Sequence, residues 1–316
     1  MSHLAKDILF GISAADALGV PVEFKSSADI NLASVQSNYQ DISNRFLPFG
    51  SWNKPVGTFS DDSSLTFCTA EYLAAGETDL NDLMDRFKQW LKEGYWTTDG
   101  HTFDVGRTTL FAIENFIADY NWRTAGLNTE RDNGNGSLMR IAPLLLPLLY
   151  DQTITDPYQY ICDFSSVTHA HSISVDSCFI YLMYAKQLYY AKDTALAFVK
   201  MKEELGINYA KNPVFKRLFS EDFLSLSPTI FNSQGYVVGS LEIAMHSLLT
   251  TNSYEEAILQ AISLGKDTDT NAAITGALAG LLYGYDSIPS HWIDPLKRKE
   301  DIEALADQLY ATCTRV

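Results

Sequence analysis

Apolar residues recur at intervals of three and four positions along most of this chain, which is the spacing of amphipathic helices. Between residues 80 and 91, for example, Leu83, Phe87 and Trp90 fall on one helix face. The segment before it stops at Gly76, a residue typical of helix ends. The pattern predicts helices over residues 4–19, 62–75, 80–91, 105–118, 137–150, 172–190, 240–250, 254–264, 269–283 and 300–312.

Alternating patterns typical of strands are scarce, and Tyr236-Val237-Val238 is one of the few β-rich runs. Polar stretches containing glycine and aromatic residues predict long surface loops at 25–58 and 94–104. The segment 206–235 holds two prolines and is expected to be irregular. Because neither repeats nor composition breaks divide the chain, we expect one all-α domain over residues 1–316.

The most membrane-like run, Ala272 to Gly284, is too short to span a bilayer. Its glycines at positions 276, 280 and 284 share one helix face, which predicts a core helix in close contact with its neighbour. The N-terminus lacks the basic region and the uninterrupted apolar stretch of a signal peptide. We therefore expect a cytoplasmic protein without membrane contact.

Composition limits the possible partners. The 316 residues are 46% hydrophobic and 20% charged, as in an ordinary globular protein, and carry a formal charge of −16. That charge argues against a general nucleic-acid surface. The four cysteines form no C-x-x-C pair, so buried thiols in a reducing compartment are expected.

Two acidic clusters, Ser60-Asp61-Asp62-Ser63 and Asp267-Thr268-Asp269-Thr270, are the strongest chemical signal. Each precedes an apolar helical segment, so helix capping is one explanation. If the fold brings them together, four carboxylates would repel one another unless cations lay between them. Oxygen ligands without Cys or His suit Mg²⁺ or Mn²⁺. The clusters together predict a two-metal site.

Two other acidic motifs fit less well. The D-x-D-x-T order of Asp267 to Thr270 is superficially that of haloacid-dehalogenase-type phosphatases, but there the motif follows a buried strand. Here the preceding residues 261–264 continue a helical pattern. The D-D-x-x-D motif of prenyltransferases fails because Leu65 stands where the third acid should be.

A glycine-rich segment, Asp132 to Ser137, lies between the acidic clusters. Its two glycines permit close approach of a ligand, and a loop leading into a helix can hold a phosphate, although Asn-Gly also marks ordinary turns. For Arg140 a structural ion pair is favoured over a phosphate contact. His169 is either a cap or core group, or a ribose or phosphate contact.

The order of these motifs resembles the ADP-ribosylglycohydrolase family, in particular its dinitrogenase reductase-activating glycohydrolase branch. The resemblance spans nearly the whole chain. It rests on Gly11-x-x-x-Ala15-Asp16-Ala17-Leu18-Gly19-x-Pro21-x-Glu23, Gly57-Thr58-Phe59-Ser60-Asp61-Asp62-Ser63, Asp104-Val105-Gly106, Gly134-Asn135-Gly136-Ser137-Leu138-Met139-Arg140, Thr168-His169 and Leu264-Gly265-Lys266-Asp267-Thr268-Asp269-Thr270.

The resemblance implies a compact orthogonal multi-helix bundle with two Mg²⁺ or Mn²⁺ ions in a cleft. By that likeness the metal ligands would be Ser60, Asp61, Asp62, Asp267, Asp269 and Thr270. Glu23 would lie close to the metals, and Tyr236 would stack on the adenine. The residues expected to hold ADP-ribose are Asp104, Gly134, Asn135, Gly136, Ser137 and His169.

Four positions depart from the family pattern. Ser60 and Ser63 replace threonines and keep an oxygen, while Ala15 replaces a glycine in a packing position. Lys266 replaces the second glycine of the usual Gly-Gly-Asp. Its ammonium group could pair with a carboxylate, reach a substrate phosphate or weaken metal binding.

The resemblance implies hydrolysis at C1″ of ADP-ribose attached to a protein, with arginine the first choice of linkage. Asp62 or Glu23 is the expected base, and Asp132 would protonate the leaving group or contact the arginine side. The protein is expected to act as a monomer on ADP-ribosylated protein. The rival hypothesis is an immunity protein that occludes an ADP-ribosyltransferase toxin through the loops 25–58 and 206–235.

Overall fold

The computed structural model describes residues 4–33, 35 and 50–315. Part of the loop expected at 25–58, residues 34 and 36–49, lies outside the described residues. Helices make up the architecture: α1 (Leu4–Gly19), α3 (Asp61–Ala75), α4 (Leu80–Glu93), α5 (Arg107–Asp119), α6 (Trp122–Ala125), α7 (Leu145–Tyr150), α8 (Pro157–Ser166), α9 (Ser172–Ala191), α10 (Thr194–Tyr209), α11 (Val237–Thr250), α12 (Tyr254–Ser263), α13 (Thr268–Tyr283), α14 (Ser290–Ile293) and α15 (Lys299–Cys313).

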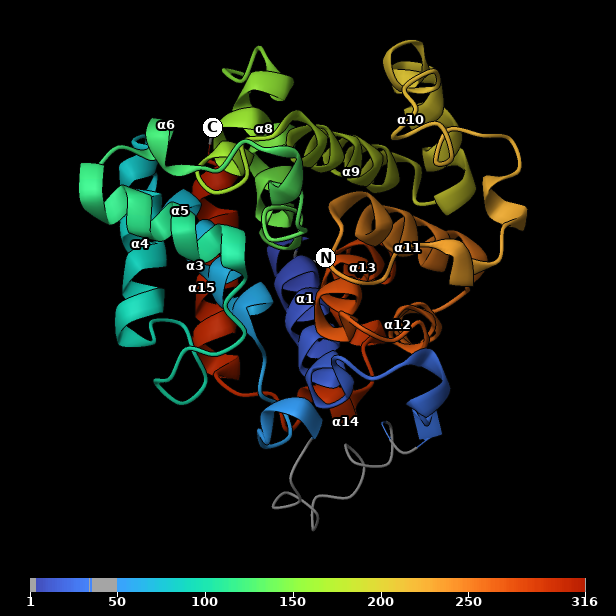
Figure 1. Ribbon diagram of the computed structural model, residues 1–316, viewed down its shortest axis with the longest axis horizontal. Coiled ribbons are helices and arrows are strands. Elements are labelled where there is room, and N and C mark those ends of the chain that lie inside the picture. Colours follow the sequence, from blue (N-terminus) through green and yellow to red (C-terminus); the bar gives the residue numbers. More distant parts are fainter. Residues whose placement is uncertain (1–3, 34, 36–49, 316) are drawn as a thin grey trace.

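Helices α1 and α13 form the buried centre of the bundle (Figure 1). Their backbones touch: a Cβ added to Gly11 would lie 2.4 Å from the carbonyl oxygen of Gly276, and one added to Gly280 would lie 2.1 Å from that of Asp7. The predicted close-packed glycine face is therefore real at Gly276 and Gly280, whereas Gly284 ends the helix with φ +82°. Only a glycine pair permits this approach of two helix axes.

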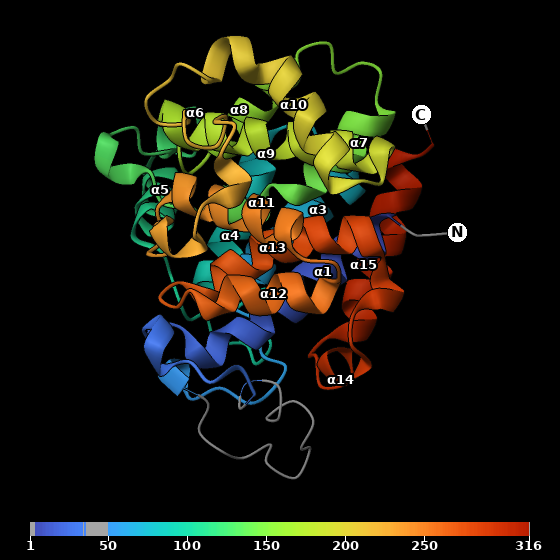
Figure 2. The same cartoon turned by 90° about the vertical axis from the view of Figure 1, so that its right-hand side faces the viewer.

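The remaining helices pack around this pair. Helices α3 and α15 contact α1 on one side, and α11 and α12 contact α13 on the other (Figures 1 and 2). Among the described residues, β-type pairing is limited to three isolated bridges, Ser26–Gly265, Leu127–His169 and Gly134–Tyr236. None of the described helices has the length and hydropathy required to cross a membrane.

Antiparallel packing of α1 against α13 brings the end of one helix to the start of the other. The hydroxyl of Thr268 donates to the carbonyl of Gly19 at 2.9 Å. Helix α3 begins at the same place, because Asp16 in the last turn of α1 accepts hydrogen bonds from the backbone N–H groups of Ser60 and Ser63. Three helix ends therefore meet at one buried point.

Some predicted elements differ from the observed ones. The helix expected over 137–150 is two short 3₁₀ turns followed by α7, because Pro143 removes a backbone donor in the middle of the segment. The β-rich run at 236–238 begins helix α11 instead of a strand. Helices α8 and α10 were not predicted, although Asp156 and Asp193 cap them with side-chain hydrogen bonds.

Candidate metal centre and pocket

Both acidic clusters lie at the point where the three helix ends meet. Asp62, in the first turn of α3, and Asp269, in the first turn of α13, have fully buried side chains. Ligand oxygens of Asp16, Asp62 and Asp269 lie within 4.8 Å of one another. A second group within the same limit consists of Glu23, Asp104 and Asp269. Asp269 therefore joins two groups of carboxylates that could each hold a cation.

The hydrogen bonds of these carboxylates leave specific oxygens free. Oδ2 of Asp62 accepts hydrogen bonds from Ser60 Oγ at 2.9 Å and Thr270 Oγ1 at 3.3 Å. Oδ1 of Asp269 accepts one from the backbone N–H of Thr270 at 3.0 Å. The other oxygens, Asp62 Oδ1 and Asp269 Oδ2, are buried without a partner among the described residues. A buried acceptor without a donor is costly, so these two oxygens indicate a missing positive group.

Burial raises the pKa of every carboxyl group in this cluster. It raises the pKa of Asp16 and of Asp267 to about 6. Burial and then the charge of Asp104 raise the pKa of Glu23 to about 9. The pKa values of Asp61, Asp62 and Asp269 lie well above the ordinary range for the same reason, reinforced by neighbouring carboxylates. Ionising the whole cluster at neutral pH therefore requires compensating cations.

The donor set fits Mg²⁺ or Mn²⁺, because it offers carboxylate and hydroxyl oxygens and neither sulfur nor imidazole. Helix capping is present in the first cluster, where the Ser60 side chain caps α3 by accepting from the Asp62 N–H, and it is compatible with a metal site there. Asp267 occupies the N-cap position of α13 but makes no side-chain cap bond. Its Oδ2 instead accepts from the amide of Asn135 at 2.7 Å.

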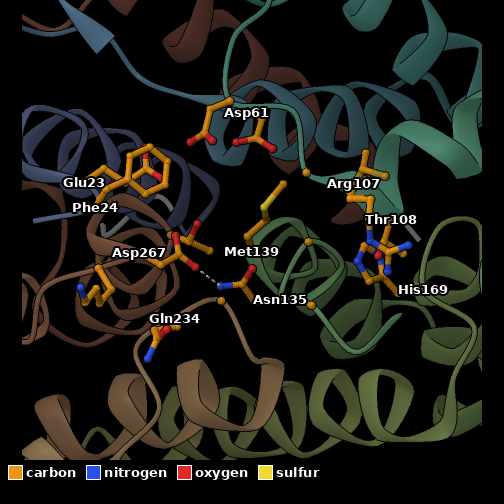
Figure 3. A pocket seen from close by; sticks show the side chains of 18 of the residues that line it. Glu23, Phe24, Asp61, Arg107, Thr108, Asn135, Met139, His169, Gln234 and Asp267 are labelled. Atoms are coloured by element: carbon orange, nitrogen blue, oxygen red, sulfur yellow. Dashed lines mark hydrogen bonds between the residues drawn. The ribbon is translucent and has the colours of Figure 1, made fainter. Parts of the chain in front are cut away.

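A pocket of about 630 Å³ opens above this cluster. Figure 3 shows that the pocket has two ends, with Glu23 and Asp267 across from Arg107 and His169. Asp61 and Asp104 also line it, whereas Asp62 and Asp269 lie beneath its floor. The volume is within the usual range of small-molecule sites.

The glycine-rich loop forms the wall between the two ends. A Cβ added to Gly136 would lie 2.8 Å from Cε1 of His169, so a glycine allows loop and imidazole to touch. Gly134 and Asn135 line the pocket, and the Asn135 amide also donates to Ser240 Oγ. Ser137 does not line it, because its hydroxyl is buried against Ser165 and Cys178. The loop leads into a 3₁₀ turn rather than the expected long helix.

Of two other predicted ligand residues, His169 lines the pocket and Tyr236 does not. His169 lines the pocket with a side chain that is 2% exposed. Tyr236 is half-buried at the start of α11 and is not among the lining residues, which include its neighbours Gln234 and Gly235. Adenine stacking on Tyr236 therefore stays a prediction.

Asp132 has a different environment from the one expected of a general acid. Its carboxylate accepts from the N–H and hydroxyl of Thr129, and from Arg107 at 2.7 Å. Burial alone would raise its pKa, but these hydrogen bonds outweigh it and the pKa of Asp132 is lowered. The group is ionised at neutral pH and holds Arg107, which lines the pocket.

Sequence reasoning did not assign Asp16, Phe24, Trp52 or Arg107 to the site. Trp52 donates through Nε1 to Glu23 Oε2, and its ring lies 5.9 Å from that of Phe24 at the pocket. The available signal for Asp16 was an acid within the apolar second half of α1, which is rare without a partner. Trp52 and Arg107 reach the site only through tertiary structure.

The backbone conformation of Lys266 accounts for the glycine that the family pattern has at this position. Its backbone has φ +67°, in the left-handed region. Both of its peptide groups are bonded to the segment after Glu23: the N–H of Lys266 donates to the carbonyl of Lys25, and the N–H of Phe24 donates to the carbonyl of Lys266. Phe24 and Asp104, which also line the pocket, share positive φ values of +64° and +54°. The site thus concentrates backbone strain.

Lys266→Gly is expected to raise the free energy of unfolding by about 1 kcal/mol, because glycine adopts positive φ without strain. Lys266→Ala is the control, since it removes the ammonium group and keeps the strain. Urea titration of the metal-free proteins measures the difference. Equal stabilities of the two variants would show that the left-handed backbone costs nothing here. Mn²⁺ affinity is measured for the same two variants. An equal increase in both would show that the increase comes from loss of the ammonium charge and not from the backbone.

The fold and the site together define an all-α protein whose pocket has an acidic floor suited to divalent cations. The family model described as ADP-ribosylglycohydrolase matches residues 3–316. A solved structure described as an ADP-ribosylglycohydrolase-related protein complex aligns with a TM-score of 0.80 and 26% identity, over 99% of each chain.

Relatives with functional names include two bacterial proteins. The ADP-ribosylarginine hydrolase of Serratia proteamaculans (strain 568) is 30% identical over 309 residues, which are 97% of this chain and 78% of that protein. The ADP-ribosyl-dinitrogen reductase glycohydrolase of Rhodospirillum rubrum is 26% identical over 299 residues, 93% of this chain and 90% of that protein. This chain belongs to the ADP-ribosylglycohydrolase family. The predicted family, fold class and enzyme class are confirmed.

Proposed function

We propose that this protein is a metal-dependent hydrolase that releases ADP-ribose from modified protein side chains, with arginine as the preferred linkage. Family membership and the name of the Serratia relative support the reaction and the linkage. The observation that carries the metal dependence is the pair of buried carboxylate oxygens, Asp62 Oδ1 and Asp269 Oδ2, that have no donor among the described residues.

The residues that would hold two Mg²⁺ or Mn²⁺ ions are Ser60, Asp61, Asp62, Asp267, Asp269 and Thr270, joined by Asp16, Glu23 and Asp104 from the two carboxylate groups. When bound, the ions supply positive charge that fixes the sugar oxygens of the substrate. Asn135 holds the Asp267 carboxylate, and Asp16 holds the start of α3. The chain thus orients its ligand groups before substrate arrives.

The chemistry at C1″ needs a base, a water molecule and stabilisation of a positively charged sugar. Of the two expected bases, Glu23 lines the pocket and Asp62 is buried below it, so Glu23 is the better placed. Its pKa of about 9 without metal means that it would act as a base only when bound cations lower that pKa. The carboxylates at this end stabilise the oxocarbenium-like centre that develops. Asp132 acts by holding Arg107 and not as a proton donor.

A panel of ADP-ribosylated substrates tests the proposal. Proteins or peptides carrying ADP-ribose on arginine or on serine are incubated with the protein and Mg²⁺ or Mn²⁺, and free ADP-ribose is measured. We expect release from the arginine linkage. Release from serine alone would overturn the linkage, and release from neither would overturn the hydrolase. The rival hypothesis, an immunity protein that occludes a toxin with or without hydrolase activity, is not favoured by the family and the relatives.

A further inference from the structure

Arg140 is a buried cation without an acidic partner. Its side chain is 0% exposed, and within the described part of the chain no carboxylate pairs with it, in contrast to the expected ion pair. The guanidinium lies 4.8 Å from the ring centre of Phe87. Its Nη2 donates to the carbonyl of Phe164 at 3.0 Å and to the hydroxyl of Thr168 at 2.8 Å. Burial of such a group is expensive and requires an explanation.

The bond to Thr168 continues to the pocket. Thr168 Oγ1 lies 2.8 Å from His169 Nδ1. A guanidinium can only donate, so the Thr168 oxygen accepts from Arg140. The hydroxyl has one proton of its own, and His169 Nδ1 is the acceptor within reach in the described structure. Nδ1 therefore accepts, and the neutral imidazole carries its proton on Nε2.

Nε2 of His169 is the nitrogen that faces the glycine-rich loop. Cβ atoms added to Gly134 and Gly136 would lie 3.7 Å and 3.2 Å from it. Burial, together with the charge of Arg140, lowers the pKa of His169 to about 3, so the ring stays neutral. In Figure 3 this ring lies near Arg107 and across the pocket from Glu23. The pocket wall therefore presents a fixed N–H donor at the end opposite Glu23 and Asp267.

We propose that Arg140 and Thr168 are positioning residues that hold His169 in the Nε2–H form, so that this N–H donates to an anionic oxygen of the ligand. The ligand group is the diphosphate of ADP-ribose, and this identification rests on the proposed function. The form of the imidazole does not depend on it. Without the relay, either ring nitrogen could carry the proton and the donor would be present for only part of the time.

Nitrogen-15 NMR of histidine-labelled wild-type protein tests the imidazole form without any ligand. The signals of His169 are assigned by their loss in His169→Asn. We expect a proton on Nε2, an unprotonated Nδ1 and no titration between about pH 5 and pH 8. A proton on Nδ1, or titration in this range, would overturn the relay.

Binding of ADP-ribose, measured by calorimetry in one Mg²⁺ buffer, tests the role of the Thr168 hydroxyl in ligand binding. Thr168→Val keeps the side-chain shape but removes the hydroxyl, so we expect mixed imidazole forms and a Kd raised about 10-fold. Thr168→Ser restores the hydroxyl and should bind like wild type. Thr69→Val is the matched control, because it removes a buried hydroxyl that bonds only the carbonyl of Leu65.

The outcomes separate the two claims. An unchanged Kd and unchanged imidazole signals in Thr168→Val would show that the hydroxyl serves stability alone and would overturn the proposal. Equal weakening in Thr69→Val would do the same. If wild-type protein shows the Nε2–H form but does not bind ADP-ribose, the ligand assignment is overturned while hydrolysis is judged separately by the substrate panel.

Discussion

Replacing Asp269 with asparagine should lower turnover by about 10²–10⁴-fold while making the metal-free protein more stable. Asp269 is shared by both carboxylate groups, is 0% exposed and keeps one oxygen without a partner. Asparagine has the same shape and is neutral, so the metal-free fold no longer contains a buried carboxyl group whose pKa is raised by burial and by its acidic neighbours. We expect the free energy of unfolding in EDTA to rise by about 1 kcal/mol or more.

Thermal or urea unfolding with and without Mn²⁺ measures the change in stability, and turnover is measured on the same proteins. Wild-type protein should gain stability from Mn²⁺ by mass action, and Asp269→Asn should gain much less. Asp193→Asn is the control, because this exposed acid caps α10 and asparagine caps equally well. Full turnover in Asp269→Asn would contradict the metal assignment, as would an equal gain from Mn²⁺.

A single methyl group at Gly276 should destabilise the fold by about 3 kcal/mol or more. The added Cβ would lie 2.2 Å from the backbone oxygen of Gly11 and 2.8 Å from Cβ of Ala15. No side-chain rotation relieves a clash with a backbone atom, so α1 and α13 must separate. The same movement would pull Asp16 away from Asp269, and metal affinity should fall as well.

Gly206→Ala is the matched substitution for this test. Gly206 lies within α10, and an added Cβ would meet nothing within 4 Å. Alanine should stabilise that helix by about 0.5–1 kcal/mol. Urea unfolding of the two variants should therefore shift in opposite directions from wild type. A neutral Gly276→Ala would mean that the two helices are not in backbone contact.

The helices with strong periodicity were predictable from the sequence because burial of one face fixes their spacing. Helix α4 was expected over 80–91 and spans Leu80–Glu93, with Leu83, Phe87 and Trp90 on its buried face. The prediction for 137–150 was wrong because apolar spacing does not reveal that Pro143 interrupts the helix before α7. The run 236–238 failed because three apolar residues fit the start of a helix as well as a strand.

The site was predictable in its types of residue and not in its full membership. Asp62 and Asp269 could be predicted because they lie beside hydroxyl residues at the starts of helices. Asp16 and Trp52 could not be predicted, because their contacts form only when α1, α3 and the segment near residue 52 meet. The left-handed backbone of Lys266 was hidden for the same reason, since a φ angle is set by tertiary hydrogen bonds.

The central claim is that the buried carboxylates serve a metal-dependent release of ADP-ribose. The most direct measurement is the rate of ADP-ribose release from an ADP-ribosyl-arginine protein by EDTA-treated enzyme, before and after addition of excess Mg²⁺ or Mn²⁺. We predict a background rate in EDTA and recovery of turnover with metal. An unchanged rate in EDTA, or no release with either metal, would contradict the account.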